Sequence, residues 1–181
     1  MKLHLGCGKR HLPGQDWLNI DNRADVGADM VMDVTHLDDI SAGTVELIYA
    51  CHVLEHVPRN QTLDVLREWR RVLKPGGILR LSVPDFRAIA RLYRDDKVPM
   101  WRLIGPLVGR QDYPQNAHYN IFDYDYLAWH LEQAGFHSVT TWTLADWGYL
   151  DLPCWEKWDD YSQATIDARG ISLNVEAIRG A

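Results

Sequence analysis

The chain has 181 residues, of which 46% are hydrophobic and 24% charged, values typical of one globular domain. Its longest apolar runs, such as Leu47–Cys51, are far shorter than the ~18 residues of a membrane span, and no signal-peptide pattern precedes them, so we expect a cytoplasmic protein. A net charge of −6 argues against long nucleic acid as a partner, because phosphate neutralisation dominates that kind of binding.

Short apolar or β-branched runs along the chain predict strands. The predicted strands are 2–5, 17–21, 30–33, 45–50, 78–83, 137–143 and 171–178. Apolar residues at helical spacing predict helices over 58–74, over 86–94 and from the cap Asp123 through Ala134. This alternation predicts a parallel α/β sheet covered by helices on both faces, with ligands beyond the carboxyl ends of its strands.

Two stretches, 97–122 and 144–170, lack a clear period. Loops of this length usually serve as lids or binding segments. We therefore expect both on the substrate side of a single domain that spans residues 1–181.

A glycine-rich turn, Gly6-Cys7-Gly8, follows the first predicted strand. Glycine lets the backbone turn tightly and approach a ligand closely. A dinucleotide site would carry a third glycine where this chain has His11, and Pro13 breaks any helix after about one turn. The turn therefore favours a nucleoside without phosphates over a pyrophosphate, although a plain tight turn is an alternative.

Aspartates close the next two predicted strands. The carboxylate of Asp21 can accept hydrogen bonds from both hydroxyls of a ribose, and that of Asp33 can accept from the amine of an adenine. Either one alone is equally consistent with a turn or helix cap. Their position with the glycine turn, at three successive strand ends, favours a nucleoside site.

With these features the chain resembles class I S-adenosylmethionine-dependent methyltransferases, and more narrowly small bacterial members often linked to polysaccharide or secondary-metabolite biosynthesis. The resemblance spans nearly the whole chain. It is carried by the segments 4–10 (HLGCGKR), 18–21 (LNID), 32–34 (MDV), 50–57 (ACHVLEHV), 72–78 (VLKPGGI) and 134–136 (AGF). It implies a Rossmann-like three-layer sandwich with a seven-stranded, mostly parallel sheet whose last strand is antiparallel.

The resemblance also implies S-adenosylmethionine as the cofactor and a role for each matching residue. Gly6, Cys7 and Gly8 lie under the methionine moiety. Asp21 holds the ribose, while Asp33 and the backbone of Val34 face the adenine. Cys51 and His52 line the methionine side, and Arg10 can pair with the methionine carboxylate. The chain departs from the family at His4, where an acidic residue is common, and in its nearly missing first helix.

A second interpretation comes from His52-Val-Leu-Glu55-His56, which matches the HxxEH pattern of zinc peptidases. That chemistry needs the motif inside a helix, whereas here it directly follows a predicted strand and Pro58 indicates a new helix start. The three cysteines have no CxxC spacing either, so neither a disulfide framework nor a metal site is predicted.

Three residues are candidates for the base that assists methyl transfer to a hydroxyl: His56, His118 and Asp85. Each has a structural alternative, because His56 and Asp85 can cap the helices that follow them and His118 can hold a loop. Arg87, Arg91 and Arg94 share a helical face that could dock an anionic acceptor, with a solvated face as the alternative.

The sequence thus predicts a methyltransferase that acts on a hydroxyl or amine of a small molecule or glycan precursor, either as a monomer or as an oligomer. The alternatives are a non-catalytic S-adenosylmethionine-binding partner protein, an NAD-binding oxidoreductase and an HxxEH zinc hydrolase. The acceptor itself cannot be read from the pattern, because it depends on how 97–122 and 144–170 fold.

Overall fold

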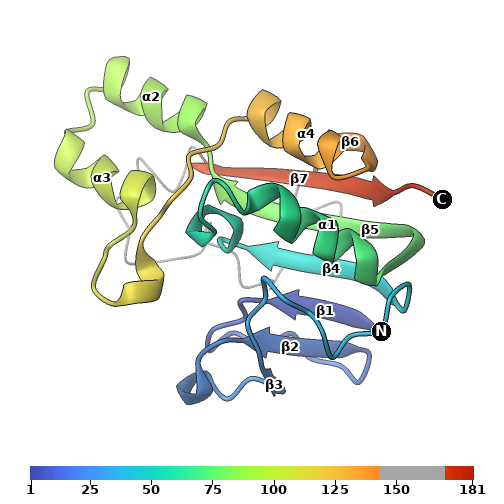
Figure 1. Ribbon diagram of the computed structural model, residues 1–181. Coiled ribbons are helices and arrows are strands. Elements are labelled where there is room, and N and C mark those ends of the chain that lie inside the picture. Colours follow the sequence, from blue (N-terminus) through green and yellow to red (C-terminus); the bar gives the residue numbers. More distant parts are fainter. Residues whose placement is uncertain (143–169) are drawn as a thin grey trace.

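The computed structural model describes residues 1–142 and 170–181, so the expectation for 144–170 falls almost wholly outside the described residues. Among the described residues, seven strands form one sheet in the order β3-β2-β1-β4-β5-β7-β6 (Figure 1). The strands are β1 (Lys2–Leu5), β2 (Trp17–Asp21), β3 (Met30–Val31), β4 (Val45–Cys51), β5 (Leu73–Pro84), β6 (Phe136–Thr141) and β7 (Ser172–Arg179).

The strands run parallel except for β7, which pairs antiparallel with both β5 and β6. The central strand β4 is buried over most of its length, which explains its nearly continuous apolar run. The expected Rossmann-like α/β fold, with seven strands and an antiparallel last strand, is confirmed.

Helices α1 (Thr62–Val72) and α4 (Tyr124–Gln133) lie side by side over one face of the sheet (Figure 1). Asp123 caps α4 as predicted, because its Oδ1 accepts from the backbone N–H of Tyr126 at 2.9 Å. The apolar core between the helices and the sheet includes Leu66, Trp69, Leu127, Leu131, Leu3, Ile48, Leu79 and Val175.

On the opposite face, the described residues form a smaller apolar cluster. Tyr49 is fully buried at its centre, with Trp142 packed edge-on at 6.3 Å between ring centroids. The other members are Leu12, Trp17 and Cys51.

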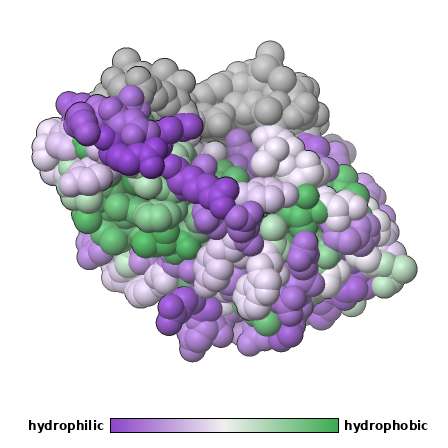
Figure 2. All heavy atoms as spheres, turned by 90° about the horizontal axis from the view of Figure 1, so that it is seen from above, coloured by the Kyte–Doolittle hydropathy of each residue, from purple (hydrophilic) through white to green (hydrophobic). Residues whose placement is uncertain are grey.

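Two further helices, α2 (Phe86–Arg94) and α3 (Met100–Val108), pack against each other beyond the end of β5. Phe86, Trp101 and Ile104 are large apolar side chains that remain exposed there. Figure 2 shows hydrophobic residues gathered on the left of the molecule, the side on which Figure 1 places α2 and α3.

The observed elements differ from the predicted ones in three places. Helix α1 begins at Thr62 rather than at 58, because Pro58 first closes a turn in which its carbonyl accepts from the N–H of Gln61 at 2.8 Å. It ends at Val72 because Leu73 already pairs with Val45 in the sheet. Strand β3 stops at Val31, since the following residues turn away from the sheet.

The third difference is α3, which lies within the stretch 97–122 that showed no period. Its sequence is apolar nearly all round and contains Gly105 and Pro106, so the amphipathic pattern of a surface helix is missing. In the described part of the chain, no helix has the length and apolar character needed to cross a membrane.

Candidate active site

A cavity of about 730 Å³ lies at the carboxyl ends of β1, β2 and β4. From β1 the chain continues toward β2, and from β4 toward β5 on the other side, so the cavity lies where the strand order reverses, as ligand sites of such sheets do. Its walls include every residue that the sequence assigned to the cofactor: Gly6, Cys7, Gly8, Arg10, Asp21, Asp33, Val34, Cys51 and His52.

The glycine turn forms the floor of this cavity under tight steric limits. Gly6 has a φ of +63° and Gly8 a φ of +53°, a region that L side chains rarely adopt. A Cβ on Gly6 would lie 2.4 Å from Cγ2 of Val53, whereas a Cβ on Gly8 would meet no atom of the described residues within 4 Å. Gly6 is therefore required by packing, and Gly8 leaves space above the turn.

Asp21 holds the turn from the end of β2. Its Oδ2 accepts from the N–H of Gly8 at 2.8 Å, and its Oδ1 accepts from the N–H of Arg23 at 2.9 Å. The residue is only 7% exposed. Each carboxylate oxygen keeps a further lone pair, so Asp21 can still accept hydrogen bonds from a ligand in the cavity.

Asp33 lies in a turn beyond β3 and is exposed. Its Oδ1 accepts from both the N–H and the hydroxyl of Thr35, at 2.9 and 2.7 Å. The next residue, Val34, is held by Trp69 of α1, whose Nε1–H donates to the Val34 carbonyl at 2.8 Å. Asp33 therefore does stabilise a turn, which was the structural alternative to a ligand-binding role. The same turn places Asp33 on the cavity wall.

Neither of the two cysteines in the cavity wall is placed as a reactive thiol. Burial raises the pKa of Cys7 to about 12, aided by the charge of Asp21, so this thiol stays protonated near neutral pH. Cys51, at the end of β4, is buried and forms no disulfide. Neither residue is therefore placed as a nucleophile.

His4 is also part of the wall and is 2% exposed. Its Nδ1 lies 3.2 Å from Oδ1 of Asn19, which can only accept, so Nδ1 carries the proton and Nε2 keeps a lone pair. Burial lowers the pKa of His4 to about 4. The imidazole of His4 is therefore neutral near pH 7.

Beyond β4 the HxxEH segment forms a 3-10 turn, η2 (Leu54–His56), rather than the helix that zinc peptidases need. His52 has a φ of +55°, and its ring lies between Glu55 and Ser172, with Nδ1 2.9 Å from Oε1 of Glu55 and Nε2 2.9 Å from the Ser172 hydroxyl. Because His52 is engaged in this way, the peptidase arrangement of its ring with that of His56 is not formed.

His56 and His118, two of the three predicted bases, lie together. Their rings meet edge to face with 4.7 Å between centroids, and His56 lines the cavity. Burial lowers the pKa of His118, so its imidazole is neutral at pH 7. The segment that carries His118 is tied to η2, because the N–H groups of Tyr119 and Asn120 both donate to the Glu55 carbonyl.

Asp85, the third predicted base, does not line the cavity. It caps α2, with Oδ1 accepting from the N–H of Arg87 at 2.9 Å, which is the structural alternative that the sequence offered. Two of the three arginines on the exposed face of α2 are engaged in ion pairs, whereas Arg91 has none within the described part of the chain. Arg87 pairs with Asp123 and Asp125, and Arg94 pairs with Asp95.

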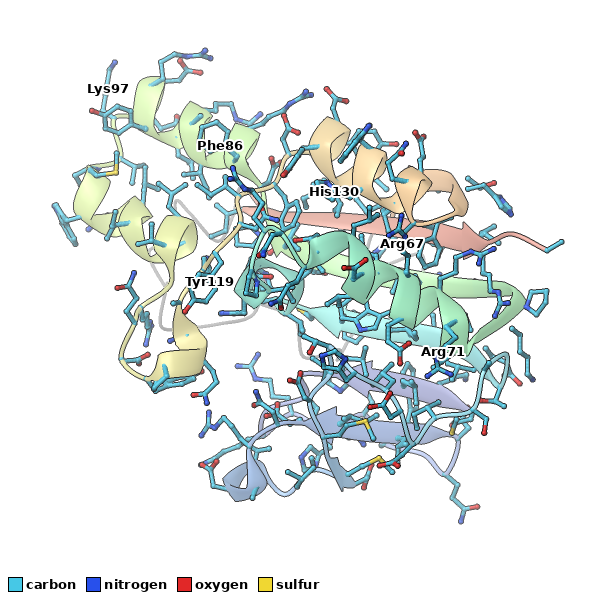
Figure 3. All side chains as sticks on the ribbon, viewed as in Figure 1. Arg67, Arg71, Phe86, Lys97, Tyr119 and His130 are labelled. Carbon is cyan, nitrogen blue, oxygen red and sulfur yellow. The ribbon has the colours of Figure 1, made fainter. Side chains whose placement is uncertain are left out.

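Sequence reasoning missed several residues of the wall. Arg23 lies two residues beyond Asp21, and its guanidinium stacks 5.1 Å from the ring centroid of Tyr113, which joins the β2 side of the cavity to the stretch 97–122. Tyr119, on the chain that leads from the turn η3 (Pro114–Asn116) to α4, lines the same cavity (Figure 3). The signal in the sequence that could have indicated these tyrosines was the presence of aromatic residues in the stretch 97–122, which has no clear period.

Comparison with known proteins identifies a family that matches the chain. Residues 6–141 match a family described as a methyltransferase domain. No protein of curated function matches the chain in sequence.

Three solved structures resemble the fold at low sequence identity. A possible exported protein from Bordetella parapertussis is 14% identical with a TM-score of 0.62, over 99% of this chain and 62% of that one. A SAM-dependent methyltransferase from Archaeoglobus fulgidus is 13% identical with a TM-score of 0.59, over 98% and 85%. The Burkholderia thailandensis 1,6-didemethyltoxoflavin-N1-methyltransferase, with 1,6-didemethyltoxoflavin and S-adenosylhomocysteine bound, is 14% identical with a TM-score of 0.60, over 99% and 71%.

Proposed function

Because this chain belongs to the methyltransferase domain family and uses S-adenosylmethionine, we propose that it methylates a hydroxyl or amine of a small molecule. The observation that carries the proposal is the shared cavity, in which the nine expected cofactor residues and His56 line one space. The acceptor then lies on the His56 side, and the cofactor lies along the strand ends.

The residues present suit the cofactor. The free space above Gly8 is one that a side chain would fill, and Asp21 has lone pairs directed at the same space for a ribose. Asp33 and the Val34 backbone would face the adenine, and Cys51 and His52 would line the methionine. For the methionine ammonium, which usually meets an acid, we propose Nε2 of His4 as a neutral acceptor.

When bound, S-adenosylmethionine supplies a methyl group already activated by a positively charged sulfur. The chain then has to hold the acceptor in line, an effect worth up to about 7–11 kcal/mol. Tyr113–Asn116 and Tyr119 border the cavity opposite the strand ends, so we propose that the stretch 97–122 shapes the acceptor side. His56 offers a lone pair on Nε2 to the acceptor proton, because its Nδ1–H donates to the Ala117 carbonyl at 3.0 Å.

The test is calorimetry with S-adenosylmethionine, S-adenosylhomocysteine and NAD. We expect the first two to bind and NAD not to bind. Asp21→Ala should weaken binding at least tenfold, while Asp39→Asn, an exposed aspartate away from the cavity, should leave it unchanged. Binding of NAD alone would favour the oxidoreductase alternative and contradict the proposal.

Turnover is the second part of the test. A panel of hydroxyl and amine acceptors, glycan precursors included, should contain at least one that is methylated, with a lower kcat for His56→Ala. If S-adenosylmethionine binds and no acceptor is methylated, the result contradicts the catalytic proposal and favours a non-catalytic S-adenosylmethionine-binding partner protein.

A further inference from the structure

Three side chains from distant parts of the chain meet beside the cavity: Glu55, His56 and His118. One ligand atom from each lies within 4.8 Å of the other two. Two come from η2, and the third comes from the loop before α4.

The hydrogen bonds of the two imidazoles define their tautomers. Nδ1 of His56 lies 3.0 Å from the Ala117 carbonyl, and Nδ1 of His118 lies 3.1 Å from the Pro106 carbonyl. A carbonyl only accepts, so each Nδ1 carries the proton. Each Nε2 is left with a lone pair, and a backbone carbonyl on the far nitrogen is the usual support of a metal-binding histidine.

Glu55 adds a third acceptor. Its side chain is completely buried, and Oε1 accepts from His52 at 2.9 Å. Oε2 is buried and has no hydrogen-bond partner among residues 1–142 and 170–181. An unpaired buried carboxylate oxygen is costly unless a donor or a cation compensates it. The three residues that meet here thus include two imidazoles that each keep a lone pair and a carboxylate with an unpaired oxygen.

We propose that Glu55, His56 and His118 bind a divalent transition-metal cation. Two imidazoles and one carboxylate are a common ligand set for such ions, zinc included. Three atoms at most 4.8 Å apart place a central cation within about 2.8 Å of each, so movements of roughly 0.7 Å per side chain give normal zinc distances.

This site is not the peptidase site that the HxxEH pattern suggests. In that pattern both histidines are ligands and the glutamate activates water. Here His52 is engaged by Glu55 and Ser172, Glu55 is itself a ligand, and His118 replaces His52. His52 becomes the residue that orients the carboxylate.

The cation would act on the acceptor side of the cavity, because His56 belongs to the cavity wall. This part rests on the proposed function. With Nε2 of His56 bound to the cation, that nitrogen no longer acts as the base. Instead, an acceptor hydroxyl bound to the cation would lose its proton to water more easily than a free one. Its oxygen then takes the methyl group while the sulfonium becomes a thioether, so the products are the methyl ether, S-adenosylhomocysteine and one proton.

The test measures binding of Zn²⁺ to chelator-treated protein by calorimetry and metal analysis. We expect one Zn²⁺ per chain, and at least a tenfold rise in Kd for Glu55→Gln and for His118→Gln. The matched control is His130→Gln, since His130 is also buried with Nδ1 on a backbone carbonyl, that of Tyr126, but lies on α4 away from Glu55. Absence of stoichiometric binding, or equal binding by all variants, would overturn the proposal.

A second measurement uses only the wild-type chain, so it does not depend on whether the variants fold. Co²⁺ bound to the wild-type chain should show the visible spectrum of imidazole ligation, and the spectrum of aqueous Co²⁺ would count against the site. Calorimetry with S-adenosylhomocysteine on the same samples separates the two proposals. If the wild-type chain binds S-adenosylhomocysteine but not Zn²⁺, the metal site alone is rejected, and if it binds Zn²⁺ but not S-adenosylhomocysteine, the cofactor assignment alone is rejected.

Discussion

Gly6 and Gly8 share a backbone conformation but differ in what surrounds them. Gly6→Ala forces both the strained φ and a clash with Val53, so we expect it to lower the free energy of unfolding by about 2–5 kcal/mol. Gly8→Ala carries only the backbone strain, about 1–2 kcal/mol. Urea unfolding of the two variants measures the difference.

Substitution of Gly8 should also affect the affinity for the ligand. The Cβ of Gly8→Ala enters open space beside the cavity, so this variant should stay folded yet bind S-adenosylhomocysteine more weakly in calorimetry. Equal unfolding free energies for the two variants would contradict the packing argument.

His4 makes stability depend on pH. Its pKa is about 4 in the folded chain because of burial, against 6.5 for an ordinary histidine, so below pH 6.5 the unfolded chain binds the extra proton first. The contribution is fully present above pH 6.5 and is lost as the pH falls toward 4. We expect His4 to account for roughly 2 kcal/mol of lost stability between pH 7.5 and pH 5.

The measurement compares the wild type with His4→Gln, which retains an amide donor for Asn19 and does not titrate. Denaturant unfolding at both pH values should show a smaller loss in the variant by that amount. Parallel losses in the two proteins would mean that His4 takes up its proton equally in the folded and unfolded chain.

At the scale of elements, α1 supports the cavity wall at Val34 as well as the core. Trp69 donates to the Val34 carbonyl, Oε1 of Glu68 accepts from the N–H of Leu37, and Arg71 donates to the carbonyls of Leu37 and Ile40. Figure 3 shows Arg71 directed from α1 toward this loop. The helix thus sets the position of Val34 through side-chain hydrogen bonds.

Trp69→Phe should therefore affect binding beyond its effect on packing. It leaves the Val34 carbonyl without its donor, at a cost of about 1–3 kcal/mol in unfolding free energy, and should raise the Kd for S-adenosylhomocysteine. Trp129→Phe, in which the residue is 51% exposed on α4, is the control and should change neither quantity. Unchanged affinity in Trp69→Phe would show that Val34 does not depend on this bond.

At the scale of the whole molecule, the cavity joins strand ends and the stretch before α4, so a ligand in it holds separate parts of the folded chain together. S-adenosylhomocysteine at 100 times its Kd should add about 2.7 kcal/mol to the free energy of unfolding. For a chain of this size the Tm then rises by about 5–10 °C. Thermal unfolding with and without the ligand measures this, and a Tm that does not respond would contradict the assigned site.

Much of the cavity wall at the strand ends was predictable because it depends on local patterns. Gly6 and Asp33 come after strands and Asp21 ends one, and the carboxyl ends of parallel strands meet at one edge of a sheet. The family resemblance then added Cys51 and His52, which the same argument places at the end of β4. None of these placements required knowledge of a distant contact.

The acceptor side was less predictable because its residues depend on packing between distant segments. From the sequence, Asp85 could be either a base or a helix cap. The structure shows the cap, because its carboxylate accepts from the backbone N–H of Arg87. The arginines of α2 had the spacing of an anion dock, but Asp123 and Asp125 reach Arg87 from the start of α4. Helix spacing alone does not contain such partners.

The sequence by itself determined the α/β fold, the methyltransferase resemblance and the edge of the sheet that carries the nucleoside-type residues, because strands and the residues at their ends follow local periodicity. Only the tertiary structure brought His118 to Glu55 and His56, left His4 buried and neutral, and engaged His52 with Ser172. His118 depends on how a loop with no period packs on the turn after β4, His4 on its packing beside Asn19 and Tyr49, and His52 on the pairing of β7 with β5. Such burial and hydrogen-bond partners arise only when distant segments pack together.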